Sequence, residues 1–234
     1  MAAAPLTAPA HLGKILGKAL RQEPLAPYTT WRIGGPAQYL LAPESPEDAA
    51  QTVAAARREG WPVFYLGRGS NLLIADGGLP GLTLHLGRSL GHITVDGTVL
   101  RAGAGVYLPH LAAFLARRGW AGFEFLIGIP GSVGGAVRLN AGTGPGQEIS
   151  DRLHSVTVLN TDGAVQTLTA AELHLGYRQS VLLKEPRWLV LEAQFFLTDQ
   201  APPGELAARH RRIIAARRAK FPPEKLTGGS VFKN

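Results

Sequence analysis

Apolar and polar positions alternate along the chain with periods that predict both helices and strands. Residues 45–60 open with Ser-Pro-Glu-Asp and close with Arg-Arg-Glu-Gly, so an N-cap, a proline at the first helical position, early acids and a terminal glycine predict a helix. Residues 62–66, Pro-Val-Phe-Tyr-Leu, predict a buried strand, and residues 82–86 alternate like a second strand. Further helical patterns lie at 109–118 and 203–220.

Two Asp-Gly pairs predict antiparallel hairpins. Asp96-Gly97 and Asp162-Gly163 each lie between short strand-like segments, as in two-residue hairpin loops. Thr169 and Glu172 form a capping-box pattern, which predicts a short helix after the second hairpin. Hairpins exclude a purely parallel, doubly wound sheet, so we expect an α+β fold. The turn at 199–204 is the expected domain boundary, because charge and helical character rise after it.

The composition limits the classes of protein to which the chain can belong. With 234 residues, of which 45% are hydrophobic, it can form one large domain or two smaller ones. It has no cysteine, which excludes a disulfide, a thiolate nucleophile and a Cys-ligated metal, and makes the cytoplasm the expected location. Apolar runs are far shorter than the roughly 20 residues of a membrane span, so membrane insertion is not expected. The net charge of +7 suits anionic partners without choosing among them.

A first glycine-rich loop follows the strand predicted at 62–66. In Gly67-Arg68-Gly69-Ser70-Asn71 the two glycines let the backbone point successive amides at an anion, while Ser70 and Asn71 add side-chain donors. The third glycine of a dinucleotide fingerprint is missing, because that position is Leu72. Taken alone, a loop of this kind is more often a tight turn than an anion site.

A second glycine-rich segment, Gly128-Ile-Pro-Gly-Ser-Val-Gly-Gly135, continues to Asn140-Ala-Gly142. Such a density of glycine indicates either a close approach of the backbone to another group or a need for turns with positive φ. The two segments lie about sixty residues apart, and each follows an apolar run. This arrangement favours a dinucleotide bound by both.

Three further patterns have both a functional and a structural interpretation. Tyr177-Arg178 places a guanidinium where it could stabilise an enolate or a carboxylate, although such pairs are usually surface or packing pairs. The basic helix predicted at 203–220 is either a solvated face or a phosphate contact at its C-terminal end. Ser230, after two glycines, is a candidate proton donor or a simple turn residue. The seven histidines have no metal-ligand spacing, so no metal site is proposed.

Six motifs in this order closely resemble the MurB family, the UDP-N-acetylenolpyruvoylglucosamine reductases. The resemblance covers about residues 20–234, and the second glycine segment resembles the branch of the family without an extra tyrosine loop. The motifs are Thr29-Thr-Trp-Arg-Ile-Gly-Gly35, Gly67-Arg-Gly-Ser-Asn71, Gly128-Ile-Pro-Gly-Ser-Val-Gly-Gly135, Asn140-Ala-Gly142, Tyr177-Arg-x-Ser180 and Gly229-Ser-Val-Phe-Lys-Asn234.

The resemblance implies a flavoenzyme with two FAD-binding lobes of the vanillyl-alcohol-oxidase type, at 1–72 and 73–199, and an incomplete α+β substrate domain at 200–234. FAD would lie between the lobes with its pyrophosphate on the glycine loops. NADPH would reduce the flavin, which would reduce the enolpyruvyl group of UDP-N-acetylglucosamine enolpyruvate to UDP-N-acetylmuramate for peptidoglycan synthesis. A cytoplasmic monomer acting on this small molecule, and not on nucleic acid, is expected.

The resemblance also assigns roles to individual residues. Arg178 would stabilise the enolate-like intermediate, and Ser230 would protonate the substrate carbon. Tyr177, Lys220, Lys233 and Asn234 match substrate-binding positions, with Lys220 at the diphosphate. The positions expected to contact the cofactor are Arg32, Gly67, Arg68, Gly69, Ser70, Asn71, Gly128, Ile129, Gly131, Ser132, Gly134, Gly135 and Asn140.

The chain departs from the family at its C-terminal end. The family's second catalytic group, a Glu well after the Ser motif, has no position in a sequence that ends at Asn234. We therefore expect a C-terminally truncated member in which FAD binding survives better than reduction of the enolpyruvyl group. Residues 140–146 also replace a stretch that usually contains an aromatic residue.

Three alternatives stay open. The charge of +7 and the basic helix are compatible with a nucleic-acid-binding module, although aromatic residues are sparse there. A flavin oxidase of the same fold that uses oxygen instead of NADPH is a nearer alternative. A non-catalytic remnant that binds only flavin is the third.

Overall fold

The computed structural model describes residues 6–9, 12–221 and 226–229. These residues form two compact units, each of which we describe by itself. Unit 1 contains the described residues of 1–89 together with 226–229, and unit 2 contains residues 90–221. The last described segment of the chain thus belongs to the same unit as the first.

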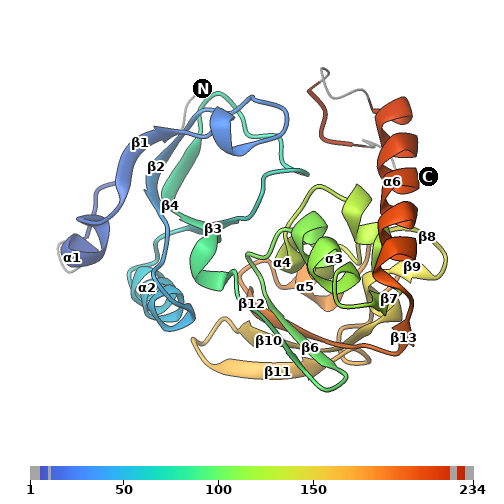
Figure 1. Cartoon of the computed structure of the whole chain (residues 1–234). Helices are drawn as coiled ribbons and strands as arrows, with labels where there is room; N and C mark the ends of the chain where they lie inside the picture. The colour runs from blue at the N-terminus through green and yellow to red at the C-terminus, as the bar shows by residue number, and fades with distance from the viewer. Residues whose placement is uncertain (1–5, 10–11, 222–225, 230–234) are drawn as a thin grey trace. The chain divides into compact units, whose positions relative to one another are not determined.

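Unit 1 is built around a mixed four-stranded sheet (Figure 1). Its strand order is β1-β2-β4-β3, in which β1 pairs antiparallel with β2 and the other neighbours are parallel. Helix α2 makes the crossover from β2 to β3. The elements of the unit are α1 (Gly13–Leu16), β1 (Leu20–Pro24), the 3₁₀ turn η2 (Ala26–Tyr28), β2 (Pro36–Leu41), α2 (Pro46–Arg58), β3 (Val63–Leu66) and β4 (Leu79–His85), followed by η3 (Arg88–Leu90) at the junction with unit 2.

The helix predicted from Ser45 onward is confirmed as α2. The Ser45 hydroxyl accepts a hydrogen bond from the Asp48 N–H at 3.1 Å, and the Asp48 carboxylate accepts one from the Glu44 N–H at 2.8 Å. The first of these bonds satisfies a backbone donor that the first turn of a helix leaves free, and the second ties the residue before the N-cap to that turn. The strands predicted at 62–66 and 82–86 are confirmed as β3 and β4.

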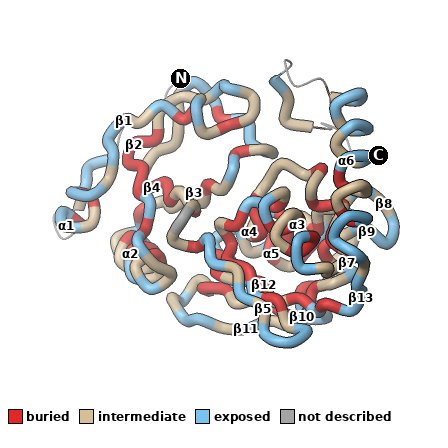
Figure 2. The backbone as a smooth tube through the Cα atoms, in the orientation of Figure 1, coloured by how far each residue is buried: buried red, intermediate tan, exposed pale blue. Residues whose placement is uncertain are grey.

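Unit 2 is built around a five-stranded antiparallel sheet of order β11-β10-β12-β6-β5, with α3 and α4 over one face (Figure 1). Buried positions gather on the central strand β12 and on α3 (Figure 2). The sheet strands are β5 (Ile93–Asp96), β6 (Val99–Gly103), β10 (Leu153–Leu159), β11 (Val165–Thr169) and β12 (Leu189–Phe196). The helical elements are α3 (Leu108–Ala116), η4 (Glu124–Gly128), α4 (Val133–Arg138), η5 (Ile149–Asp151), α5 (Val181–Lys184) and α6 (Pro203–Lys220).

Both predicted hairpins are confirmed, as β5–β6 and β10–β11. Together with the parallel pairs of unit 1 they make an α+β fold, as expected. The helix expected after the capping box at Thr169 is wrong. Glu172 accepts hydrogen bonds from the Thr169 N–H and hydroxyl at 2.8 and 2.7 Å, but the segment stays a turn because His174 adopts a left-handed φ of +46°.

The helix predicted at 203–220 is confirmed as α6, and it packs within unit 2. Leu206 is buried against Ala116 and Ala121. The preceding strand β13 (Asp199–Gln200) pairs with β7 (Trp120–Ala121). The division observed in the structure falls after residue 89, whereas the sequence places boundaries after 72 and 199. The assignment of these segments to two FAD-binding lobes and a substrate domain stays a prediction.

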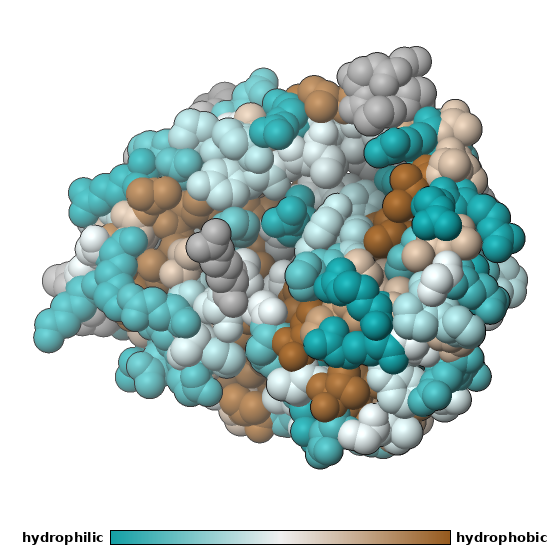
Figure 3. Space-filling model, viewed as in Figure 1, coloured by the Kyte–Doolittle hydropathy of each residue, from teal (hydrophilic) through white to brown (hydrophobic). Residues whose placement is uncertain are grey.

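Hydrophilic side chains lie beside apolar ones over α6 in the space-filling view (Figure 3). Arg211, Arg212 and Arg218 of this helix are exposed. In the described part of the chain, no helix has the length and apolar character that crossing a membrane requires.

The core of unit 2 can be tested at two neighbouring phenylalanines. Phe195 is fully buried with its ring 5.9 Å from that of Phe123 in an edge-on contact, while Phe196 on the other face of β12 is 42% exposed. We expect Phe195→Ala to lower the free energy of unfolding by about 3–5 kcal/mol, because it removes buried apolar surface and leaves a cavity. Phe196→Ala, the matched control, should cost about 1 kcal/mol or less. Urea unfolding measures both, and equal losses would contradict this description of the core.

Candidate functional site

The first glycine loop follows β3 and packs on the segment around Thr30. Gly69 has a φ of +60°, and a Cβ built on it would lie 2.0 Å from the Tyr28 carbonyl oxygen, so this position accepts only glycine. The Thr30 N–H donates to the Gly69 carbonyl at 3.3 Å. Arg68 and Asn71 are exposed beside this turn, and Ser70 is half-buried. The structure thus gives the predicted loop a rigid base and leaves charged and amide groups at its surface.

Arg32 lies in the same unit, on the turn that supports the loop. The buried Thr29 hydroxyl donates to the Ile33 carbonyl at 2.9 Å, which closes this turn. Arg32 has a left-handed φ of +55° and an exposed side chain. The structure therefore places Arg32 and the loop at 67–71 on adjoining segments, and their shared role as cofactor contacts stays a prediction.

The far end of the chain returns to this turn. A Cβ on Gly228 would lie 2.0 Å from the Trp31 Nε1, so Gly228 sits directly against the indole ring. This contact places the residues that precede Ser230 on unit 1. Ser230, Lys233 and Asn234 themselves lie outside the described residues, and their predicted roles stay predictions.

His85 is a feature of this region that the sequence did not single out. It ends β4 opposite Leu66, and its ring meets the Tyr28 ring edge-on at 5.1 Å. Burial and the positive charge of Arg68 lower the pKa of His85 below its ordinary value. The imidazole is therefore neutral at pH 7, and Arg68 supplies the charge beside the loop. In the sequence, only the position of His85 at the end of an alternating strand could have indicated that it lies beside the first glycine loop.

The second glycine segment is hydrogen-bonded to the chain that follows β6. The Val133 and Gly134 N–H groups donate to the Val106 and Ala104 carbonyls, both at 2.9 Å, and the Leu108 N–H donates to the Gly131 carbonyl at 3.0 Å. These bonds fix the start of α4. Gly135 is exposed, whereas Gly128 and Ser132 are buried and Ile129 is half-buried.

The predicted catalytic residue Arg178 and the predicted substrate-binding residue Tyr177 lie at the tip of a tight turn in unit 2. Gly176 and Gln179 pair through two backbone hydrogen bonds of 3.2 and 3.0 Å, which leaves Tyr177 and Arg178 between them. The Arg178 guanidinium donates to the main-chain carbonyls of Asn140 and Gly142 at 3.3 and 3.4 Å. Tyr177 is 45% exposed, and the Arg178 guanidinium carbon lies 5.1 Å from the centre of its ring.

Asn140 contacts the turn that carries Arg178 and is fully buried, with 0% exposure. Its amide nitrogen donates to the Glu148 carboxylate at 3.0 Å and to the Gly176 carbonyl at 3.1 Å, and its oxygen accepts from the Ser150 N–H at 2.9 Å. The sequence named Asn140 as a cofactor contact but gave no role to Glu148. The cofactor role stays a prediction, while the structure adds Glu148 as a partner.

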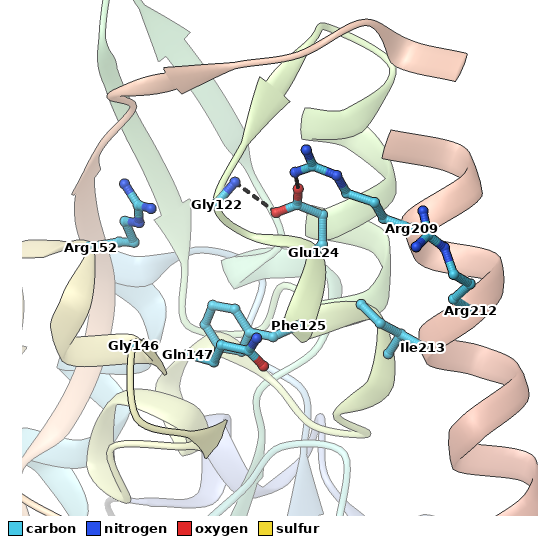
Figure 4. A pocket seen from close by; sticks show the side chains of 9 residues that line it. All are labelled: Gly122, Glu124, Phe125, Gly146, Gln147, Arg152, Arg209, Arg212 and Ile213. Atoms are coloured by element: carbon cyan, nitrogen blue, oxygen red, sulfur yellow. Dashed lines mark hydrogen bonds and ion pairs between the residues drawn. The ribbon is translucent and has the colours of Figure 1, made fainter. Parts of the chain in front are cut away.

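A pocket of about 370 Å³ opens in unit 2 beside α6 (Figure 4). Its one carboxylate, Glu124, contacts the Arg209 guanidinium at 2.6 Å and accepts a hydrogen bond from the Gly122 N–H at 2.7 Å. Burial alone would raise the pKa of Glu124, but these hydrogen bonds and that of its own N–H hold the pKa below its ordinary value. The lining residues are Gly122, Glu124, Phe125, Gly146, Gln147, Arg152, Arg209, Arg212 and Ile213.

Lys220, the predicted diphosphate contact, is exposed in the last turn of α6 and does not line this pocket. Its ammonium lies 5.5 Å from the centre of the Phe221 ring. Among the described residues, no three His, Asp or Glu side chains are grouped so that they could hold a metal ion.

Comparison with known proteins gives one consistent result. A family model described as an FAD binding domain matches residues 37–169. The UDP-N-acetylenolpyruvoylglucosamine reductase of Desulforamulus reducens is 40% identical over 226 residues, which cover 94% of this chain and 72% of that protein. The Rubrobacter xylanophilus protein of the same name is 42% identical over 95% of this chain and 73% of that protein. The crystal structure of the MurB enzyme from Thermus caldophilus matches with a TM-score of 0.76 and 36% identity, over 92% of this chain and 74% of that one.

The rigidity of the first loop predicts a contrast between two glycines of unit 1. Gly69 and Gly60 have similar φ values of +60° and +66°, but a Cβ on Gly60 meets nothing within 4 Å. Gly60→Ala should therefore lower the free energy of unfolding only by the strain of a left-handed backbone at a non-glycine residue, about 1 kcal/mol. Gly69→Ala must also displace the Tyr28 carbonyl, so we expect a loss at least about twice as large. Thermal unfolding measures both variants. Equal losses of stability would show that the Tyr28 carbonyl moves aside at little cost, and would contradict the rigidity of the loop.

The half-buried carboxylate of the pocket predicts a pH dependence. Because the pKa of Glu124 is depressed in the folded protein, its contribution is present above the ordinary value of 4.5 and is lost as the pH falls through the folded value. Glu124→Gln should lower the free energy of unfolding at pH 7 by on the order of 1 kcal/mol and flatten its acid dependence.

Glu205 is the matched control, because it contacts the same Arg209 at 2.6 Å but its side chain is 50% exposed, against 13% for Glu124. Glu205→Gln should change the stability little, since exposed ion pairs contribute little. Urea titrations over the acid range compare the two variants. If both variants lost the same stability, the smaller exposure of Glu124 would not strengthen its ion pair with Arg209, and the prediction would be wrong.

Proposed function

Because the chain belongs to the family of UDP-N-acetylenolpyruvoylglucosamine reductases, we propose that it reduces the enolpyruvyl group of UDP-N-acetylglucosamine enolpyruvate to form UDP-N-acetylmuramate for peptidoglycan synthesis. It is a flavin-dependent oxidoreductase with a small-molecule substrate, FAD as cofactor and NADPH as reductant. One observation carries the proposal: the identity of 40% extends over 94% of the chain.

The residues of the first glycine loop fit a bound FAD. Gly69 leaves room only for backbone at the base of the turn, so the loop is compact, and the exposed Arg68 and Asn71 provide a positive charge and amide donors. These groups suit a pyrophosphate. FAD, when bound, carries the hydride from NADPH to the enolpyruvyl group.

The second glycine segment is proposed as the other cofactor contact of the chain. Its backbone hydrogen bonds to residues 104–108 fix the loop before any ligand binds. The exposed Gly135 presents backbone without a side chain to an approaching group. The roles of Gly128, Ile129, Gly131, Ser132 and Gly134 follow from the same segment.

Arg178 is proposed to stabilise negative charge on the substrate during reduction. Two hydrogen bonds to the carbonyls of Asn140 and Gly142 orient its guanidinium, and a guanidinium has five N–H donors. Three donors therefore remain for the carboxylate and the developing enolate of the substrate. The exposed Tyr177 and Lys220 are proposed to bind the rest of the substrate, and Ser230 to deliver the proton to its carbon.

We also propose that the chain acts as a monomer and that it is located in the cytoplasm. The cytoplasmic location agrees with the absence of cysteine from the sequence. The proposal assigns no role to nucleic acid.

Part of the positive charge of the basic helix α6, which suggested a nucleic-acid-binding module, is paired with carboxylates of the chain itself. Arg209 pairs with Glu124 and Glu205, and His210 is 8% exposed. Burial lowers the pKa of His210 below its ordinary value, so that its ring is neutral at pH 7. These observations favour a structural role for this part of α6 over a phosphate-binding face.

Anaerobic stopped-flow spectroscopy tests the proposal. The purified chain is loaded with FAD and mixed first with NADPH and then with UDP-N-acetylglucosamine enolpyruvate, while the flavin absorbance is followed. Bleaching and then recovery that depends on the UDP-sugar are expected. Arg178→Ala should leave bleaching unchanged and slow the recovery by about 10²–10³-fold, because it removes charge stabilisation in the transition state.

Arg211→Ala, on the exposed face of α6, is the matched control and should behave like the unaltered chain. A chain that takes up no FAD would contradict the proposal. Bleaching without recovery would favour the flavin-binding remnant, and rapid reoxidation by oxygen without a response to the UDP-sugar would favour the oxidase.

A further inference from the structure

We propose that Asn140 is a positioning residue that holds the turn bearing Arg178 in its reactive conformation, and that Glu148 fixes the orientation of the Asn140 amide. This inference rests on the proposed function, because it takes Arg178 as the group that meets the substrate. It gives Asn140 a role through Arg178 in place of the direct cofactor contact that the sequence suggested.

The turn needs external support because Arg178 is in an unfavourable backbone conformation. Its φ is +54°, in the left-handed region that favours glycine. It occupies the third position of the four-residue turn Gly176–Gln179, where a positive φ usually selects Gly or Asn. An arginine persists at such a position only when its surroundings enforce the conformation. The side chain is therefore retained at a conformational cost.

The Asn140 amide provides this support directly. Its nitrogen donates to the Gly176 carbonyl at 3.1 Å, and the same carbonyl accepts the Gln179 N–H that closes the turn. The Asn140 main-chain carbonyl in turn accepts from the Arg178 guanidinium at 3.3 Å. One residue thus holds both the backbone before Arg178 and the side chain of Arg178.

Glu148 determines which way the Asn140 amide points. The Glu148 carboxylate can only accept, so it requires the amide nitrogen, while the Ser150 N–H on the other side requires the amide oxygen. The carboxylate is itself held by a capping box with Asp151. A reversed amide would place its oxygen against a carboxylate and a carbonyl, so a single orientation satisfies all three partners.

Burial indicates that this role is internal. Asn140 is 0% exposed, and both ends of its amide are engaged by protein groups. Its own φ of +42° is one that asparagine tolerates better than most residues. A buried asparagine whose amide is bonded to protein at both ends affects the reaction by positioning those protein groups.

A second anchor should keep the turn attached when Asn140 is altered. The buried Ser180 hydroxyl donates to the Arg138 carbonyl at 2.6 Å, and the Arg138 guanidinium donates to the carbonyls of Leu182 and Trp188. These bonds join the segment after the turn to α4 independently of Asn140. Loss of the Asn140 amide should therefore misplace Arg178 without unfolding the unit.

Asn140→Asp tests the inference, because it keeps the shape of the side chain but replaces the donor with an acceptor. Hydrogen exchange is measured at the amides of Gly176 and Gln179, together with FAD affinity, bleaching and recovery. We expect exchange to become at least about tenfold faster, with the FAD dissociation constant and the bleaching rate within about twofold and the recovery slowed by at least about tenfold. Asn160→Asp is the matched control, because the Asn160 side chain accepts from the Asp162 and Ala164 N–H groups, a role that a carboxylate retains.

Glu148 provides a second pair of variants should Asn140→Asp fail to fold. Glu148→Gln keeps an acceptor for the Asn140 amide and should preserve the exchange rates within about threefold, whereas Glu148→Ala should accelerate them like Asn140→Asp. Unchanged exchange in both disruptive variants would overturn the inference. Weaker FAD binding with unchanged exchange would also overturn it and make Asn140 a cofactor contact.

The two proposals fail in different ways. If the unaltered chain shows no recovery with the UDP-sugar, the proposed reaction fails, but the exchange rates still decide whether Asn140 and Glu148 hold the turn. If recovery occurs and Asn140→Asp leaves it unchanged, the reaction stands and the positioning role is overturned.

Discussion

The backbone pairing between the second glycine segment and the chain after β6 determines the arrangement of the candidate site in unit 2. The N–H groups of Val133 and Gly134 donate to carbonyls at 106 and 104, and this fixes where α4 begins. α4 is short, so its end is fixed with its beginning, and Arg138 and Asn140 lie there. Through these two residues the helix holds the turn of Arg178. A glycine segment that suggests ligand binding in the sequence thus also positions the arginine that we propose as catalytic.

In unit 1 the candidate residues are positioned by close packing on glycine. Its first glycine loop follows a parallel strand, as phosphate-binding loops often do, and Gly69 packs on the Tyr28 carbonyl. The neighbouring Trp31 supports Gly228 from the far end of the chain. The loop, the turn that carries Arg32 and the segment before the predicted proton donor therefore lie in one unit.

Charge in the molecule is divided between structure and surface. The half-buried carboxylate of Glu124 pairs with Arg209, and burial keeps His85 and His210 neutral. Other cations, including Arg68 and Lys220, remain exposed at positions where the family resemblance places anionic groups. The net charge of +7 alone could not separate these two uses, because it carries no information on burial.

The sequence by itself determined the elements that depend on neighbouring residues. The cap of α2, the Asp-Gly hairpins and the bounds of α6 follow from local patterns, and the motifs identify the family and its candidate residues. The capping box at Thr169 shows the limit, because its hydrogen bonds form without a helix. Only the tertiary structure decided that Asn140 is buried under Arg178, that Glu148 orients its amide and that Glu124 meets an arginine 85 residues away. These contacts join segments that are distant in the chain, and local propensity does not encode which of them meet.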